Sequence, residues 1–288
     1  MNRLPVPKTQ DRAALKALVE NDKLKSYPKL QPHLATLRNG YAQYLQVRGD
    51  AKALSLINLP AEISDLLRGH YASPPQDVGF IKKLRDKSGV MTCPMCGSFA
   101  CGTLDHVVPK ADQAAFAVLG LNLVPACRCN TKRSTTYVGP GAGERVLHPY
   151  FDKVLARRLI VARIENPGPV PRISLHILLP DTHCRYPAIR FHLENVVGRT
   201  QVLDHLRRRW AKLMRRPGTL IVPLKRNPKT LLELDQILLD ERDRLDDLHD
   251  SRNNWDSIFL NGLLENSVQA WLFNALSRPG RMPNGPLL

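Results

Sequence analysis

The chain has 288 residues, of which 43 % are hydrophobic, so it can bury a core of ordinary size in one or two domains. Its formal net charge of +16 at pH 7 favours a polyanionic partner such as nucleic acid. No run approaches the roughly 18 apolar residues that a membrane span needs, and the first residues have no apolar stretch typical of a signal peptide. We therefore expect a cytoplasmic protein without a membrane partner.

The N-terminal region, residues 1–88, is predicted to be helical. Leu15 and Leu18 fall on one face of a first helix. Leu37 and Tyr41 lie at helical spacing in a second helix. Stripes of this kind are typical of helices that pack on a core.

Two closely spaced cysteine pairs follow this region. Cys93 and Cys96 form a C-x-x-C pair, which on a tight turn offers two of the four thiolates that zinc prefers. Cys127 and Cys129 form a C-x-C pair, whose sulfurs reach one ion less easily, so Cys101 is an alternative to Cys127. The chain lacks a thioredoxin-like βαβ pattern and a secretion signal, which makes structural zinc a better use of the cysteines than redox chemistry or disulfides.

An oxygen-rich set of side chains lies inside the same stretch. Asp105 and Asn130 offer oxygens to a magnesium-like cation, which keeps water and phosphate in its other positions. In a strand over residues 103–108, Asp105 and His106 face opposite sides unless a bend or bulge turns both toward one substrate. We therefore expect Asp105 to bind the metal and His106 to transfer a proton.

These residues together resemble the motif of HNH endonucleases, the ββα-metal nucleases. The matching segments, in the family's order, are Cys93-Pro-Met-Cys96-Gly97, Leu104-Asp105-His106-Val107-Val108-Pro109-Lys110, Asn122-Leu123-Val124-Pro125 and Cys129-Asn130-Thr131-Lys132. They cover about a seventh of the chain. The resemblance implies a strand ending in Asp105-His106, a second strand at 122–126 and a helix that begins near Asn130.

The resemblance also implies a role for each polar residue of the motif. His106 would be the general base that deprotonates the attacking water, and Asn122 would hydrogen-bond across the loop to hold His106 in place. Asp105 and Asn130 would hold one Mg²⁺ or Mn²⁺, which stabilises charge on the scissile phosphate and on the leaving 3′-oxygen. The implied structural zinc ligands are Cys93, Cys96, Cys127 and Cys129.

This sequence departs from the family's pattern at two places. One residue is missing between Cys127 and Cys129, which leaves the exact zinc tetrad open. The usual glycine-rich loop is replaced by residues 111–120, a change that does not touch the catalytic pair.

Basic side chains supply candidate contacts to phosphates. Lys132 and Arg133 lie within one helical turn of Asn130, and exposure to solvent alone is their alternative role. The densest basic cluster falls in a predicted helix at 202–214, where its spacing wraps around the helix, so only part of it can face one duplex. The candidate nucleic-acid-binding residues are Lys110, Lys132, Arg133, Arg208 and Lys212.

The C-terminal region, residues 153–288, is predicted to be mostly helical with one short pair of strands. The expected elements are a helix at 153–159 with Asp152 as its N-cap, strands at 159–165 and 171–178, and helices at 202–214, 230–249 and 254–277. The chain as a whole is therefore predicted to be α+β, a mostly helical chain around a central ββα-metal module at 89–152.

A looser resemblance extends beyond the motif. The segment from His148 to Asp152 and a late Asn254-Trp255 resemble HNH proteins of bacterial anti-phage systems, including the HNH subunit of Septu-type systems. This resemblance implies a nuclease effector that works beside an ATPase partner, with DNA favoured over RNA as substrate. The alternative is a non-catalytic, zinc-stabilised nucleic-acid-binding protein. A purely structural subunit would leave the basic excess unexplained.

Overall fold

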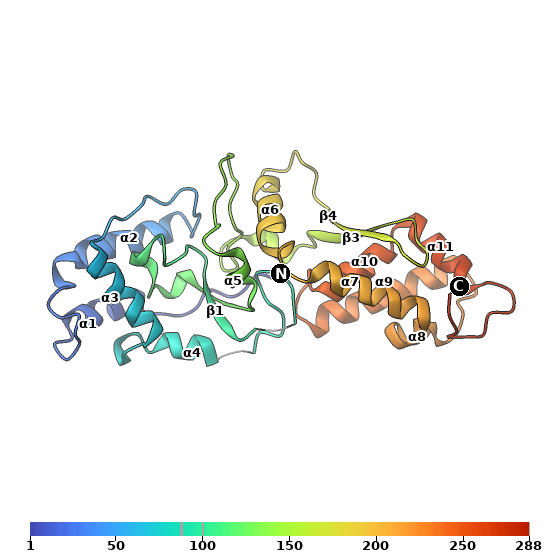
Figure 1. The fold of residues 1–288 in the computed structure, drawn as a ribbon, viewed down its shortest axis with the longest axis horizontal. Helices are drawn as coiled ribbons and strands as arrows, with labels where there is room; N and C mark the ends of the chain where they lie inside the picture. The colour runs from blue at the N-terminus through green and yellow to red at the C-terminus, as the bar shows by residue number, and fades with distance from the viewer. Residues whose placement is uncertain (87–88, 100, 288) are drawn as a thin grey trace.

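The chain forms an elongated α+β structure, seen here in a computed structural model that describes residues 1–86, 89–99 and 101–287. Within these ranges it combines many helices with two small antiparallel sheets. The N-terminal helices lie at one end, the C-terminal helices at the other, and the segment with the cysteines lies between them (Figure 1). The predicted α+β class is confirmed. Residues 87–88, which belong to the predicted helical region 1–88, lie outside the described residues, as do residues 100 and 288.

The N-terminal end is helical, as predicted. Its helices are α1 (Asp11–Glu20), α2 (Leu34–Gln46), α3 (Ala61–Ala72) and α4 (Phe80–Asp86), with 3-10 turns at Gln31–His33 and Gln76–Val78. Leu15 and Leu18 of α1 and Leu37 and Tyr41 of α2 are all buried in one cluster. The same cluster includes Leu104 and other residues of the following segment, so the helices pack directly on the stretch that carries the motif.

The middle of the chain contains a strand pair and a short helix. Strand β1 (Thr103–His106) pairs antiparallel with β2 (Leu123–Ala126), which places Asp105 opposite Val124 and His106 opposite Leu123. The connection between the strands includes 3-10 turns at Ala114–Phe116 and Gly120–Asn122. Helix α5 (Cys129–Arg133) follows β2 directly. Both strands are shorter than predicted, but their order with the helix matches the expectation.

The C-terminal end contains a hairpin and most of the remaining helices. Strand β3 (Ile160–Glu165) pairs with β4 (Arg172–Ile177), within two residues of the predicted bounds. The helices are α6 (Tyr186–His192), α7 (Val202–Arg215), α8 (Pro217–Leu220), α9 (Leu231–Leu248), α10 (Trp255–Leu263) and α11 (Asn266–Leu276). Shorter turns lie at Lys153–Ala156, Leu193–Val197 and Val222–Lys225.

Two predicted helices differ from the structure. The helix expected at 153–159 is a 3-10 turn of four residues, and Asp152 does not cap it, because its carboxylate binds Arg145 at 2.7 and 2.8 Å instead. The helix expected at 254–277 is two helices. Glu265 separates them by accepting a hydrogen bond from Val268 N and starting α11 as its N-cap.

The C-terminal helices are tied to the cysteine segment. The indole Nε1 of Trp255 donates to the backbone oxygen of Cys96 at 2.8 Å, and its backbone N donates to Gly97 O at 3.2 Å. Trp255 therefore links α10 to the cysteine segment. In the described ranges, no helix is both long enough and apolar enough to cross a membrane.

Candidate metal and catalytic centre

Four cysteine sulfurs come together at one end of the β1–β2 pair. The ligand atoms of Cys93, Cys96, Cys127 and Cys129 all lie within 4.8 Å of one another. The Cys93–Cys129 sulfurs are 3.7 Å apart and the Cys96–Cys127 sulfurs 3.4 Å apart. A zinc tetrahedron with bonds of about 2.3 Å requires sulfurs about 3.8 Å apart. The four thiols therefore fit a metal such as zinc.

Backbone geometry explains how a C-x-C pair joins this cluster. The backbone N of Cys127 donates to the Cys93 sulfur at 3.4 Å, and that of Cys129 donates to the Cys127 sulfur at 3.2 Å. Gly97 has φ +84°, and a Cβ there would lie 2.2 Å from Asn253 O, so the knuckle after Cys96 requires glycine. The sequence left Cys101 as an alternative to Cys127, and the converging set in the described chain includes Cys127.

Asp105 is already paired inside the protein. Its carboxylate oxygens each lie 3.0 Å from Nη2 of Arg133, which also donates to the backbone oxygen of His106 at 2.8 Å. Both side chains are buried, with Asp105 6 % and Arg133 1 % exposed. Burial raises the pKa of the Asp105 carboxyl, and the Arg133 guanidinium opposes that shift. The carboxylate thus has a cationic partner from α5.

His106 lies in a separate buried environment. Its Nε2 is 3.0 Å from the backbone oxygen of Ala117, and its ring meets the Tyr71 ring edge-on at 4.2 Å between centroids. A carbonyl oxygen can only accept, so Nε2 carries the proton and Nδ1 keeps a free lone pair. Burial lowers the pKa of His106 to about 3, so the imidazole is neutral near pH 7. A neutral imidazole is the form that can accept a proton.

Asn122 spans the loop between the two strands. Its Oδ1 accepts from Val108 N at 2.8 Å, and its Nδ2 donates to Val108 O and Phe116 O at 3.0 and 3.1 Å. The Tyr44 hydroxyl of α2 donates to the same Oδ1 at 2.9 Å and lies 3.0 Å from Nε2 of His148. Asn122 therefore holds the loop that supplies the Ala117 oxygen to His106. Sequence spacing alone does not reveal Tyr44 as the partner of Asn122, because the two residues are 78 positions apart.

Asn130 stands at the start of α5 and is half-buried. Its Oδ1 accepts hydrogen bonds from the backbone N and the hydroxyl of Thr131, at 2.7 and 3.2 Å. Arg133 follows three residues later on α5 and contacts Asp105. Both oxygen donors are of the type that magnesium prefers, but each is engaged within the protein.

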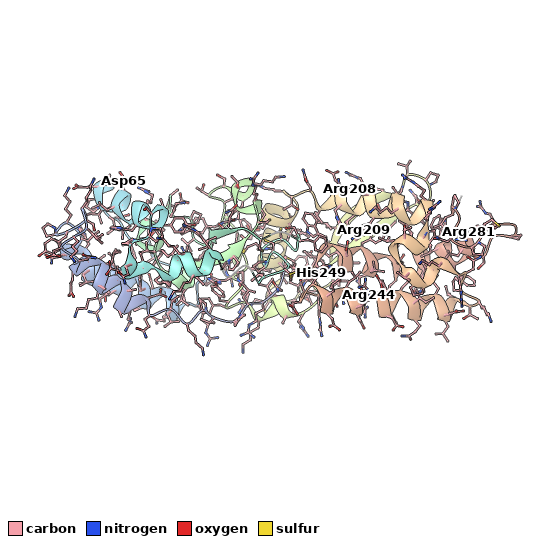
Figure 2. All side chains as sticks on the ribbon, turned by 90° about the horizontal axis from the view of Figure 1, so that it is seen from below. Asp65, Arg208, Arg209, Arg244, His249 and Arg281 are labelled. Carbon is pink, nitrogen blue, oxygen red and sulfur yellow. The ribbon has the colours of Figure 1, made fainter. Side chains whose placement is uncertain are left out.

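The five predicted nucleic-acid contacts fall into two groups. Lys132, Arg208 and Lys212 are exposed, and Lys110 is half-buried with its Nζ 5.1 Å from the Tyr71 ring centroid. Arg133 is the exception, because its buried pairing with Asp105 takes it away from the surface where a phosphate would bind. Arg208 lies on α7 beside Arg209 (Figure 2). Arg209 Nε instead donates to Asp256 at 2.6 Å.

Comparison with known proteins adds little to this geometry. No family model matches the chain, and no solved structure matches it. Among curated proteins, the chain is similar to protein ea31 of Escherichia phage lambda, with 29 % identity over 109 residues. That alignment spans 33 % of this chain and 37 % of the phage protein. The fold and site therefore define an α+β protein with a four-thiol cluster beside a buried Asp-Arg pair and a buried neutral histidine.

Proposed function

We propose that this protein is a metal-dependent HNH endonuclease that hydrolyses phosphodiester bonds of DNA. The observation that carries the proposal is the order of elements around the thiol cluster. A strand ends in Asp105-His106, a second strand follows a loop held by Asn122, and a short helix begins at Cys129-Asn130. A protein that merely binds nucleic acid has no need to assemble Asp105, His106 and Asn130 around one strand pair.

His106 would act as the general base. Its Nε2 proton is committed to Ala117 O, so the free Nδ1 is the atom that would take a proton from the attacking water. Asp105 and Asn130 would hold the divalent ion, which when bound stabilises charge on the phosphate and on the leaving 3′-oxygen. This ion would compete with Arg133 for the lone pairs of the carboxylate. The products would be a 5′-phosphate and a 3′-hydroxyl.

The test is plasmid cleavage. The wild-type protein should nick or cut plasmid DNA when Mg²⁺ or Mn²⁺ is added, and EDTA should stop the reaction. His106→Gln should reduce the rate by at least about 100-fold, because the amide keeps a donor for Ala117 O but cannot accept a proton near pH 7. The rates are compared with those of His192→Gln, in which another buried histidine that bonds a backbone oxygen is replaced. Equal rates in the two variants would rule out His106 as the base.

A second candidate function has an observation of its own. Because Asp105 is bound to Arg133 and Asn130 to Thr131, their oxygens resemble structural groups as much as metal ligands. That arrangement favours a zinc-stabilised nucleic-acid-binding protein without catalysis. It predicts salt-sensitive DNA binding but no cleavage with any divalent ion.

We also propose, on the looser resemblance alone, that the protein is the nuclease effector of a bacterial anti-phage complex with an ATPase partner. The motif-bearing segment carries the proposed chemistry, which leaves the helical ends available for such a partner. Affinity purification of the tagged protein from its native host should recover an ATPase. Recovery of the tagged protein alone, at near-native expression, would contradict this role.

A further inference from the structure

A second concave site lies where three segments of the chain meet. A cavity of about 430 Å³ is lined by residues from the end of α2 (Val47 to Asp50), from 145–157 and from the loop before α6 (His183 and Arg185). None of these residues belongs to the cysteine cluster or to the Asp105-His106 strand. The HNH motif therefore assigns no role to this cavity, although Phe151 and Asp152 belong to the segment of the looser resemblance.

The cavity is strongly basic. Five basic and two acidic side chains line it, which gives a formal net charge of +3 without His183. Four of the basic residues lie exposed around the opening, and in the described part of the chain none of the four forms an ion pair. They are Arg48, Lys153, Arg157 and Arg185.

The fifth basic residue, Arg145, forms ion pairs with both acidic residues of the cavity. Its buried guanidinium lies 2.9 Å from the carboxylate of Asp50 and 2.7 Å from that of Asp152. Asp152 also accepts from the backbone N of His148 at 2.6 Å. Both carboxylates thus have partners inside the protein. Together with Arg145 they carry a formal charge of −1, against +4 from the four exposed cations at the opening.

The turn that presents Arg48 has an unusual backbone. Arg48 has φ +52°, a left-handed conformation that non-glycine residues seldom adopt. The next residue, Gly49, has φ +62°, and a Cβ there would lie 2.4 Å from the ring of His148. Close packing on a buried histidine therefore fixes the turn, and it holds Arg48 at the edge of the cavity.

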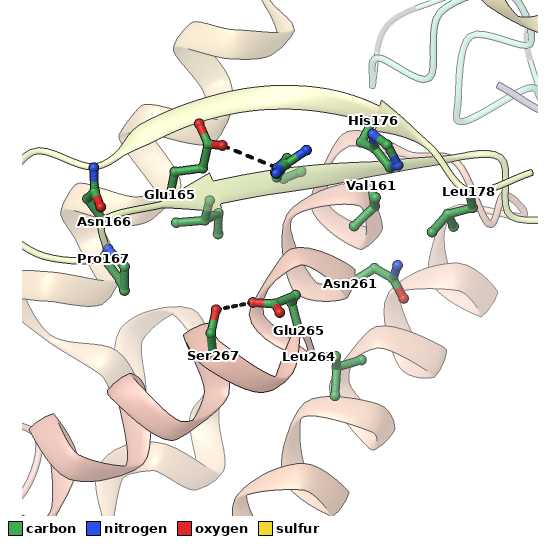
Figure 3. A pocket seen from close by; sticks show the side chains of 13 residues that line it. Val161, Glu165, Asn166, Pro167, His176, Leu178, Asn261, Leu264, Glu265 and Ser267 are labelled. Atoms are coloured by element: carbon green, nitrogen blue, oxygen red, sulfur yellow. Dashed lines mark hydrogen bonds and ion pairs between the residues drawn. The ribbon is translucent and has the colours of Figure 1, made fainter. Parts of the chain in front are cut away.

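We propose that this cavity binds several phosphate groups of one ligand, as found in a nucleoside triphosphate or along a nucleic-acid backbone. Guanidinium groups match phosphate oxygens in charge and geometry, and four separate cations suit several linked phosphates better than one. The volume lies within the range of small-ligand sites. A larger cavity, of about 600 Å³ against the β3–β4 hairpin, instead carries Glu165 and Glu265 (Figure 3). The proposal does not depend on nuclease activity.

The first experiment measures binding of inorganic tripolyphosphate by calorimetry at low salt. The double variant Arg157→Gln/Arg185→Gln should bind at least about tenfold more weakly than wild type, because two charge-assisted contacts are lost. The matched control is Arg278→Gln, an exposed arginine outside the cavity, which should bind as wild type does. Melting temperatures without ligand should be alike in all three proteins, since the substituted side chains are exposed. No binding by wild type, or equal binding by wild type and the double variant, would overturn the proposal.

The second experiment distinguishes the two sources of the phosphates. Adenosine triphosphate and a short duplex DNA are titrated into wild type and the double variant. If the substitutions weaken binding of the nucleotide and leave that of DNA unchanged, the ligand is a free nucleotide. If binding of DNA weakens in parallel, the ligand is the nucleic-acid backbone. If binding of both ligands is unchanged in the double variant, the proposed site is wrong. None of these results depends on DNA cleavage.

Discussion

The thiol cluster and the neighbouring oxygen donors are two candidate metal sites in very different states. The four cysteine sulfurs face one another within 4.8 Å, at separations suited to one tetrahedral ion. The Asp105 carboxylate is instead paired with Arg133, and the Asn130 amide oxygen with Thr131. The four ligand atoms of the first site face one another, whereas the oxygens of the second are hydrogen-bonded to Arg133 and Thr131.

This difference shows that two sets of candidate ligands in the same stretch of sequence can differ in their availability to a metal ion. Thiols are weak hydrogen-bonding groups, so four of them can share a buried site until a metal binds. Burying an unpaired carboxylate costs much more free energy than burying a thiol. An ion pair with a nearby arginine offsets part of this cost. The predictions below test this contrast, beginning with the change that should have the largest effect.

The largest effect is expected from removing one thiol. Cys93→Ser should lose the bound metal and most of the stability of the central segment, because structural zinc contributes on the order of 10 kcal/mol to folding. Metal content per chain by mass spectrometry and the thermal melting curve measure both losses. Cys184→Ser, at an exposed cysteine outside the cluster, is the control and should change neither. Full metal content in Cys93→Ser would show that the cluster is not a metal site.

The next effect concerns the buried ion pair. Arg133→Met leaves the Asp105 carboxylate buried without its cation and should lower the free energy of unfolding by about 3–5 kcal/mol, measured with urea. The double variant Arg133→Met/Asp105→Asn should regain much of this loss, since it no longer buries an unpaired charge. If Arg133→Met alone were as stable as wild type, the pairing would not be what holds α5 against β1.

A smaller effect should appear in the pH dependence of stability. Burial lowers the pKa of His148 to about 3, below its unfolded value near 6.5. The folded state therefore binds fewer protons, so this contribution is complete above pH 6.5 and is lost as the pH falls from 6.5 toward 3. His148→Gln should lower the slope of stability against pH in this range by up to about 1.4 kcal/mol per pH unit. His176→Gln, at an exposed position, should keep the wild-type slope.

The smallest effect tests the same contrast between free and satisfied groups on α7. Arg208 is exposed, whereas Arg209 binds the buried Asp256. Arg208→Gln should weaken DNA binding only a fewfold and lower its salt dependence slightly, with no change in stability. Arg209→Gln should instead destabilise the fold. A reversal of these two phenotypes would mean that the side chains change places on binding DNA.

Much of the architecture could be predicted because it depends on local patterns. The strands β3 and β4 lie within two residues of the positions that alternating apolar residues indicated, and α9 within one. The break between α10 and α11 was missed, because apolar residues continue at helical spacing across Glu265 while its side chain caps the second helix. The spacing of apolar residues indicates which face of a helix is buried. It does not indicate every point at which one helix ends and the next begins.

The candidate site was predictable in part. The two cysteine pairs indicated a four-thiol cluster, and the structure brings those sulfurs together. Arg133 was predicted to contact phosphate, and its pairing with Asp105 could not be deduced, because the two residues are 28 positions apart and meet only after the strand pair and α5 have formed. Asp152 was predicted to cap a helix and instead binds Arg145. Charged residues form ion pairs with side chains that the fold brings close in space. The spacing of residues along the sequence does not predict these pairs.

The bond from the Trp255 indole to Cys96 O has a practical consequence for anyone who would trim this chain. A fragment of residues 89–152 would lack both that indole and the Tyr44 hydroxyl that anchors Asn122. The excised piece would expose apolar surfaces on two sides and lose the ties that set its shape. The distant ends of the polypeptide therefore supply contacts to its centre, and we expect a fragment of residues 89–152 to be less stable than the same segment in the full chain.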